Sequence, residues 1–280
     1  MFVQTVIDFS KDWVRRIAKD DVVGLSAQLA YFFLLSLFPF LLFLVTLIGY
    51  LPIGEQTVSN IIGFIEVYAP SDISEMINSN ISQLVNNQNG GLLSLGIIGT
   101  IWSASNGIKA VMKAFNRAYE VDEDRSFLVA RLIAIVLTIG MVIVIFIAFL
   151  LPIFGKMIGV YIFSFFGLSD KFIAVWGTLR WVISSAVFFI VLLVLYKLAP
   201  NKRIYFKHAV WGALFATVCW QLVSLAFSYY VSSMGNYSAT YGSLGTVIVL
   251  MIWFYISGII IISGGVLNAS IIQYNIDRRK

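Results

Sequence analysis

The sequence is short of charge, since only 12% of its 280 residues are Asp, Glu, Lys or Arg while 60% are hydrophobic. Soluble domains carry about a quarter charged residues. This composition excludes an ordinary soluble domain and indicates an integral membrane protein. The single cysteine, Cys219, excludes an internal disulfide. Because a spanning backbone must satisfy its own hydrogen bonds, we expect an all-α fold.

Signatures of catalysis are also missing. Hydrolysis of phosphodiesters by metal ions needs clustered His, Asp or Glu ligands, but the chain has one histidine, His208, and no acid in a predicted span. No G-x-S-x-G, H-E-x-x-H, GKS or GKT motif occurs. We therefore predict no catalytic residue, no metal site, no cofactor and no enzymatic activity.

Stretches without charged residues predict six transmembrane helices in a single membrane domain of residues 1–280. A span needs about 20 apolar residues, and the predicted spans are residues 26–51, 91–108, 132–153, 172–196, 208–232 and 241–272. Residues 208–276 carry no charge at all, and as one helix they would reach roughly 100 Å across a core of about 30 Å. The chain must therefore reverse within "SMGNYSATYGSLG", residues 233–245.

The distribution of cations orients the predicted bundle. With the N-terminus inside, the cytoplasmic segments hold sixteen of the 19 Lys and Arg residues, whereas the outer segments hold only Lys156 and Lys171. Positive charge stays on the cytoplasmic side, so we predict that both termini are cytoplasmic. The net charge of +5 is explained in this way, and we predict no nucleic-acid partner.

Two amphipathic segments flank the predicted bundle. Residues 1–21 place Phe9, Trp13 and Ile17 on one helical face, which predicts an interfacial helix; a helix packed on the protein's own loops is the alternative. Residues 55–89 predict an outer amphipathic helical hairpin. A hairpin that only connects two spans is the alternative there.

Arg180 is the only full charge inside a predicted span. An ionisable side chain within the membrane is costly and marks a functional site by default. With no acid in any other predicted span, its partner is expected among backbone carbonyls, hydroxyls, water or an anionic ligand. The alternative is that Arg180 extends to the outer interface as an anchor.

Further candidates for a substrate pathway lie in two polar stretches. A broken helix around the second span would open a cavity at Ser103, Ser105 and Asn106, although hydrogen bonds between helices explain such residues equally. We also expect residues 236–243 to dip irregularly into the outer mouth, with the final helix beginning near Tyr241 to Leu244. The candidate residues there are Asn236, Tyr237, Ser238, Thr240 and Tyr241.

A basic stripe continues the second span toward the cytoplasm. Lys109, Lys113 and Arg117 follow one another at steps of four and so share one helical face. Such a stripe is a candidate for binding anionic headgroups. Its role in setting orientation explains it as well.

Four blocks of the sequence resemble the YihY/virulence factor BrkB family of bacterial inner-membrane proteins, some of which carry the label ribonuclease BN. The matching blocks are "AQLAYFFLLSLFPF" (27–40), "WSASNGIKAVMKAFNRAYEV" (102–121), "LYKLAPNKRIYFKHAVWGALFATVCW" (195–220) and "YSATYGSLGTVIVLMIWFYISGIIIISGGVLNA" (237–269). The resemblance covers most of the chain and implies a multi-pass protein of the bacterial plasma membrane with about six spans. Some members have been proposed to move lipids or to act as transporters.

The leading hypothesis is a plasma-membrane transporter or lipid-handling protein for an amphiphilic or anionic substrate, with membrane lipids as its partners. A structural or scaffold membrane protein is the alternative, because polar residues in spans also hold helices together. An intramembrane enzyme or ribonuclease ranks third. A cavity that contains Arg180 would favour the first hypothesis, and a dry, fully packed bundle would favour the second.

Overall fold

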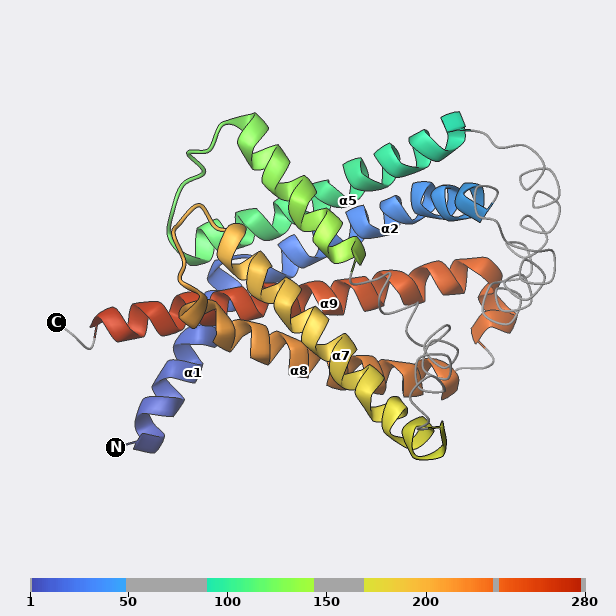
Figure 1. Cartoon of the computed structure of the whole chain (residues 1–280). Coiled ribbons are helices and arrows are strands. Elements are labelled where there is room, and N and C mark those ends of the chain that lie inside the picture. The colour runs from blue at the N-terminus through green and yellow to red at the C-terminus, as the bar shows by residue number, and fades with distance from the viewer. Residues whose placement is uncertain (1, 49–89, 144–168, 234–236, 278–280) are drawn as a thin grey trace. The chain divides into compact units, whose positions relative to one another are not determined.

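The computed structural model describes residues 2–48, 90–143, 169–233 and 237–277 (Figure 1). The described residues form helices and no strand, which confirms the predicted all-α class. The outer hairpin predicted at residues 55–89 lies outside the described residues, and so does Asn236.

Six helices are labelled in Figure 1, and a seventh covers Phe127–Ile143. The labelled helices are α1 (Phe2–Lys19), α2 (Val22–Ile48), α5 (Gly90–Ala118), α7 (Ser169–Leu198), α8 (Phe206–Ser233) and α9 (Tyr237–Asp277).

Among the described residues, five helices are long and apolar enough to cross a membrane. These candidate spans are Val22–Phe43, Gly90–Ala118, Trp181–Leu198, Phe206–Val231 and Val247–Tyr274. The helix Phe127–Ile143 is apolar but shorter, and the range predicted for the third span, 132–153, runs beyond its described end. Six crossings with both termini inside therefore stay a prediction.

Two details of the sequence-based expectation are wrong. Helix α9 begins at Tyr237, so the backbone of residues 237–243 is helical where irregular backbone was expected. Helix α5 is continuous through Ser103, Ser105 and Asn106, where a break was expected. The reason is the same in both places: glycine costs a helix only about 1 kcal/mol, less than an unsatisfied backbone group in lipid.

The chain forms two compact units. Unit 1 comprises Met1–Ser26, Ile108–Leu222 and Ile259–Lys280, and unit 2 comprises Ala27–Gly107 and Val223–Gly258. In unit 2, glycines of α5 allow close packing against α2. A methyl group at Gly96 would stand 2.8 Å from the backbone nitrogen of Phe43, and one at Gly99 would stand 2.9 Å from Pro39 Cβ.

Unit 1 is built on a close backbone contact between α8 and α9. A methyl group at Gly264 would stand 2.8 Å from the carbonyl oxygen of Gly212, so no larger residue fits without a shift. The fully buried Asn268 crosses the same contact, since its Oδ1 accepts from Gly212 N–H at 2.7 Å and its Nδ2 donates to the carbonyl of Ala209 at 3.2 Å. Small residues and side-chain amides hold helices together in this way in membranes.

Helix α7 and helix α5 join this contact through aromatic side chains. The buried Tyr196 hydroxyl donates to the carbonyl oxygen of Ile261 at 2.8 Å and lies against Gly264. The Phe115 ring, 5.4 Å from the Tyr196 ring, fills the space beside Gly265. Gly264 and Gly265 therefore leave the space that the Tyr196 and Phe115 side chains occupy.

Helix α1 packs on helices rather than on loops. Trp13 stands edge to face with Phe215 of α8 at 5.3 Å, and its Nε1 donates to the carbonyl oxygen of Ser263 at 3.4 Å. Phe9 makes a similar ring contact with Tyr274 of α9 at 5.8 Å. The face predicted to lie in the membrane interface is thus partly covered by unit 1, and Val14 is exposed elsewhere on α1.

We predict that Gly264→Ala destabilises the protein by about 1–3 kcal/mol, because the added methyl group overpacks a contact between two backbones. Gly140→Ala is the matched control, since a methyl group there meets only Val191 at 4.0 Å. Thermal unfolding in detergent micelles measures both. Equal melting temperatures for the two variants would contradict the role of the α8–α9 contact.

Candidate anion-binding site

Two groups of predicted pathway residues have side chains outside the described ones. Arg180 lies within α7, but its side chain is outside the described ones. The same holds for the side chains of four residues in the first turns of α9, Tyr237, Ser238, Thr240 and Tyr241. These residues stay predictions.

The polar residues of α5 are largely used within the protein. The buried Ser105 hydroxyl donates to the carbonyl oxygen of Trp102, one turn earlier in the same helix, at 2.9 Å. Such back-bonding satisfies a hydroxyl without a ligand. Asn106 and Ser103 are half-buried in the same helix. A pathway through these residues stays a prediction, and the bond of Ser105 favours a structural role for that side chain.

The three cations of the predicted basic stripe have different surroundings. The Lys109 ammonium lies over the Phe127 ring, 4.8 Å from its centroid, which is a cation–π contact. Lys113 is exposed. Arg117 pairs with Asp21, with Nη1 and Oδ2 3.4 Å apart. Only Lys113 therefore presents its charge to solvent without a contact among the described residues.

Two left-handed corners face each other where α1 and α5 end. Asp21 follows α1 with φ of 56°, and Glu120 follows α5 with φ of 53°. Reciprocal ion pairs tie the corners: Lys19 reaches Glu120 at 3.1 Å, and Arg117 reaches Asp21. The hydrogen bond from Lys19 lowers the pKa of the Glu120 carboxyl. These pairs are exposed and contribute little stability, so their main effect is to fix how the two corners meet.

Asp20 is buried beside these corners. Only 5% of its surface is exposed, and its Oδ2 has no hydrogen-bond partner in the described part of the chain. Burial raises the pKa of its carboxyl above the ordinary value of 3.8, although neighbouring cations oppose that rise. The charged neighbours are Arg16, Lys19, Arg117 and Glu120.

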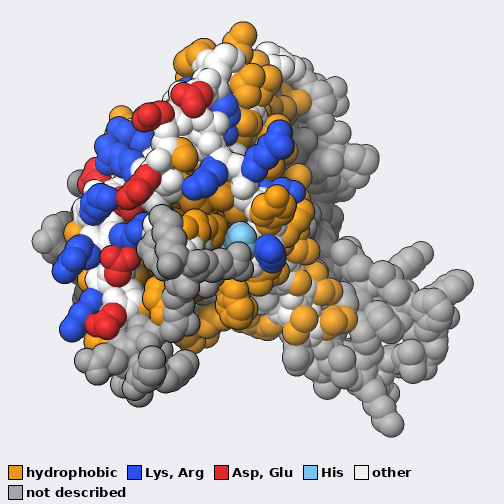
Figure 2. Space-filling view, turned by 90° about the vertical axis from the view of Figure 1, so that its left-hand side faces the viewer, with side chains coloured by type: hydrophobic (Ala, Val, Ile, Leu, Met, Phe, Trp, Pro, Cys, Tyr) orange, Lys and Arg blue, Asp and Glu red, His pale blue; other side chains and the backbone are white. Residues whose placement is uncertain are grey.

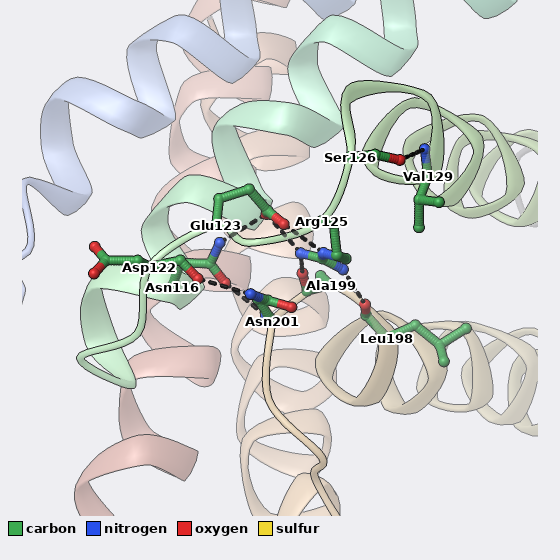
Figure 3. Close-up of polar contacts among 9 residues, drawn as sticks. All are labelled: Asn116, Asp122, Glu123, Arg125, Ser126, Val129, Leu198, Ala199 and Asn201. Carbon is green, nitrogen blue, oxygen red and sulfur yellow. Dashed lines mark hydrogen bonds and ion pairs between the residues drawn. The ribbon is translucent and has the colours of Figure 1, made fainter.

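Arg125 holds two loops together (Figure 3). Its guanidinium donates to both carboxylate oxygens of Glu123 and to the carbonyl oxygens of Leu198 and Ala199 at the end of α7, the latter at 2.9 Å. The hydrogen bond from Arg125 lowers the pKa of the Glu123 carboxyl. A cation at a helix C-terminus satisfies free carbonyls and opposes the negative end of the helix dipole.

Two asparagines complete this connection, which we call the loop latch (Asn116, Glu123, Arg125 and Asn201, with the carbonyls they contact). The buried Asn116 donates through Nδ2 to Glu123 at 2.8 Å, and its Oδ1 accepts from the backbone N–H of Asn201 at 2.7 Å. Asn201 in turn donates through Nδ2 to the carbonyl oxygen of Asp122 at 2.7 Å. The loop after α5 is thereby held against the loop after α7 (Figures 1 and 3).

The loop latch forms one wall of a pocket of about 550 Å³, which we call the basic pocket. Its lining residues are Arg125, Lys197, Leu198, Pro200, Asn201, Lys202, Arg203, Ile204, Tyr205 and Phe206. No acidic residue is among the described residues that line it. Since Arg125 is neutralised by Glu123, the charge of the pocket rests on Lys197, Lys202 and Arg203.

Aromatic rings support two of these cations. The Lys197 ammonium lies 3.6 Å from the centroid of the Phe206 ring, and the Lys202 ammonium lies 5.9 Å from that of Tyr119. Among the described residues, Lys197, Lys202 and Arg203 form no ion pair. Figure 2 shows Lys and Arg side chains on one face, interspersed with Asp and Glu side chains in one part of it and with hydrophobic side chains in another.

The position of these cations relative to α8 is electrostatically unusual. Helix α8 begins at Phe206, has no acid in its first turn and carries Lys207 there. The N-terminus of a helix is its positive end, so cations at that end are unfavourable unless an anion joins them. Free backbone N–H groups at such an end also bind anions directly. The basic pocket thus has the chemistry of an anion site.

In the sequence, the cations of the basic pocket were interpreted only as orientation signals. The sequence does contain a pattern that indicates an anion site. Residues 197–207, "KLAPNKRIYFK", interleave four cations with two aromatic residues around a helix boundary. Arg125 gave no such signal, since its partners lie 73 and 74 residues further along the chain. Within the described residues, no group of three or more His, Cys, Asp or Glu side chains is placed to hold a metal ion.

We predict that Arg125→Lys lowers the free energy of unfolding by about 1–3 kcal/mol, because lysine cannot keep the forked contacts to a carboxylate and two carbonyls. Arg203→Lys is the control, since Arg203 is exposed and forms no ion pair with the described residues. The readout is thermal unfolding in detergent. A loss of equal size in both variants would argue against the loop latch.

We predict that Asp20→Asn stabilises the protein at pH 7 and that the gain shrinks as pH falls toward 4. A raised folded-state pKa means that the contribution of Asp20 to stability is fully present below 3.8 and is lost as pH rises through the raised value. Asparagine keeps the shape but cannot ionise. Melting temperatures across this pH range test the effect against Asp8→Asn, which changes an exposed carboxylate of α1. A difference from the wild type that does not vary with pH refutes it.

Comparison with known proteins places the chain in a family. The family described as Virulence factor BrkB matches residues 13–280. A Bacillus subtilis protein named as ribonuclease-like, YfkH, is 51% identical over 94% of this chain and 94% of its own length. A UPF0761 membrane protein of Alteromonas mediterranea is 26% identical over 92% of this chain and 86% of its own length. One of Pseudoalteromonas translucida is 29% identical over 95% of this chain and 86% of its own length. No solved structure matches. The resemblance seen in the sequence is thereby confirmed, and the chain belongs to the virulence factor BrkB family of membrane proteins.

Proposed function

We propose that the protein is a transporter or lipid-handling protein of the bacterial plasma membrane that takes an amphiphilic or anionic substrate without an enzymatic step. The observation that carries this proposal is the basic pocket. Three of its cations, Lys197, Lys202 and Arg203, have no ion-pair partner in the described part of the chain and lie where two candidate spans end.

A scaffold role leaves the basic pocket without a reason. Like charges repel one another, and the dipole of α8 adds to the repulsion. Orientation requires only that cations be on the cytoplasmic side, not that they share one pocket. An anionic substrate group supplies the missing counter-charge, so binding favours this arrangement.

We place the basic pocket and both termini on the cytoplasmic side. Unit 1 contains the two ends of the chain together with the cations of α1, the corner and the basic pocket. The positive-inside rule supports this orientation. In this proposal the substrate is first bound from the inner leaflet or the cytoplasm.

Arg180 is proposed to act further along the same route. From Phe172 to Tyr196 of α7, Arg180 is the only charged residue in the sequence. A guanidinium can bind a phosphate or carboxylate through two parallel hydrogen bonds. We propose that it receives the anionic group of the substrate. Ser103, Asn106 and the first turns of α9 are proposed separately as residues of the substrate pathway.

Translocation in proteoliposomes tests the proposal. Purified protein is reconstituted with a trace of fluorescent phosphatidylglycerol, and dithionite then removes the fluorescence that reaches the outer leaflet. We predict that the wild type raises the bleached fraction above the half seen without protein, and that Arg180→Leu abolishes this effect without altering the melting temperature. Leucine retains the apolar bulk but cannot pair with an anion.

Lys11→Gln is the control, because it removes an exposed charge from α1 and should translocate like the wild type. Fluorescent phosphatidylcholine, which has no net charge, should move more slowly. A wild type that bleaches like protein-free vesicles with both lipids, or an Arg180→Leu variant with unchanged transport, counts against the proposal.

A further inference from the structure

The basic pocket lies where two candidate spans meet their connecting loop. Candidate span Trp181–Leu198 ends at the pocket and candidate span Phe206–Val231 begins there. Leu198, Tyr205 and Phe206 line the pocket and are themselves exposed. Amphipathic aromatic and basic side chains collect at the membrane interface. A ligand in the basic pocket therefore stands beside the boundary between headgroups and acyl chains.

The charge of the basic pocket exceeds what a single negative charge would balance. Three cations without ion pairs and the positive end of α8 converge there. Arg125, the fourth cation, is committed to Glu123 and to the carbonyls of α7. A phosphomonoester carries about −1.5 to −2 charges near neutral pH and offers three acceptor oxygens. Its charge and number of acceptors match the pocket better than those of a phosphodiester or a carboxylate.

An apolar stripe leads away from the basic pocket along α8. The stripe consists of Trp211, Leu214, Val218 and Leu222, which follow at steps of three and four and are all exposed. Lys207 precedes Trp211 by four residues and lies at the head of the stripe. The opposite face of α8 is buried and holds small residues, including Gly212 and Ala216. A chain attached to the phosphate can therefore lie along α8 in the hydrocarbon.

We propose that the basic pocket and the stripe of α8 form a binding site for a membrane lipid with a phosphomonoester headgroup. The phosphate binds between Lys202, Arg203 and the first turn of α8, while Lys197 closes the side formed by α7. The acyl chain lies along the stripe. This proposal rests on the proposed function and names the class of its substrate.

Equilibrium binding tests the site independently of transport. Full-length protein in detergent is titrated with four probes: phosphatidic acid, phosphatidylglycerol, glycerol 3-phosphate and inorganic phosphate, with native mass spectrometry as the readout. Phosphatidic acid should bind best, severalfold tighter than phosphatidylglycerol and at least roughly tenfold tighter than the two probes without chains, because buried chain surface adds affinity.

The variant K202Q/R203Q should lose on the order of tenfold in affinity for phosphatidic acid, because two charge-assisted contacts are removed. K11Q/R15Q is the matched control. It removes two exposed charges from α1 in the same unit, gives the same net charge and should bind like the wild type. Equal losses in both double variants would assign the effect to overall charge and overturn the site.

The remaining outcomes are equally decisive. Phosphatidylglycerol binding as tightly as phosphatidic acid overturns the phosphomonoester assignment. Glycerol 3-phosphate or inorganic phosphate binding as tightly as the lipid overturns the lipid occupant in favour of a soluble phosphate. Selective binding of phosphatidic acid without any translocation supports the site and contradicts the proposed function. Translocation with unchanged binding in K202Q/R203Q contradicts the site alone.

Discussion

The close approach of two backbones at Gly212 and Gly264 is the contact on which the rest of unit 1 depends. In lipid there is little hydrophobic gain in bringing helices together, so packing and interhelical hydrogen bonds must hold them. The short distance between α8 and α9 allows Asn268 to bridge them and brings the carbonyl of Ile261 within reach of Tyr196 on α7. The position of α7 relative to α8 follows from these contacts, and the basic pocket lies where these two helices meet their connecting loop.

The all-α fold and the places of the helices follow from the sequence because a bilayer leaves the backbone few choices. Long runs without charge predict where helices run, and polar loops predict where they end. The loop latch was missed for a different reason. Arg125 and Asn116 find their partners at Ala199 and Asn201, 74 and 85 residues away, and no local pattern announces such pairing. The opposite error occurred at Ser103 and Tyr237. Glycine and hydroxyl residues there predicted irregular backbone, but both positions lie in helices.

The Lys and Arg residues of the predicted cytoplasmic segments can set the orientation of the protein in the membrane and also make specific contacts within it. Sixteen Lys and Arg residues lie in the segments predicted to be cytoplasmic. The structure distributes them among separate tasks. Arg125 covers the carbonyls at the end of α7, Lys19 and Arg117 join two helix corners, and Lys202 and Arg203 have no ion pair within the described residues. The name of the Bacillus relative, ribonuclease-like, concerns that protein; in this chain, the described residues include no group of three or more His, Cys, Asp or Glu side chains placed to hold a metal ion.

The contacts of helix α1 with α8 and α9 bear on the order in which the helices of the protein assemble. Trp13 donates to a carbonyl 250 residues further along the chain, at Ser263 in α9, so α1 is synthesised long before this partner. Until α8 and α9 have been synthesised and inserted, Phe9 and Trp13 lack the partners that they contact in the structure. An amphipathic helix can wait on the membrane surface with its apolar face in the lipid headgroup region. Docking of Phe9 and Trp13 on these helices therefore follows the synthesis of both α8 and α9, late in the assembly of unit 1.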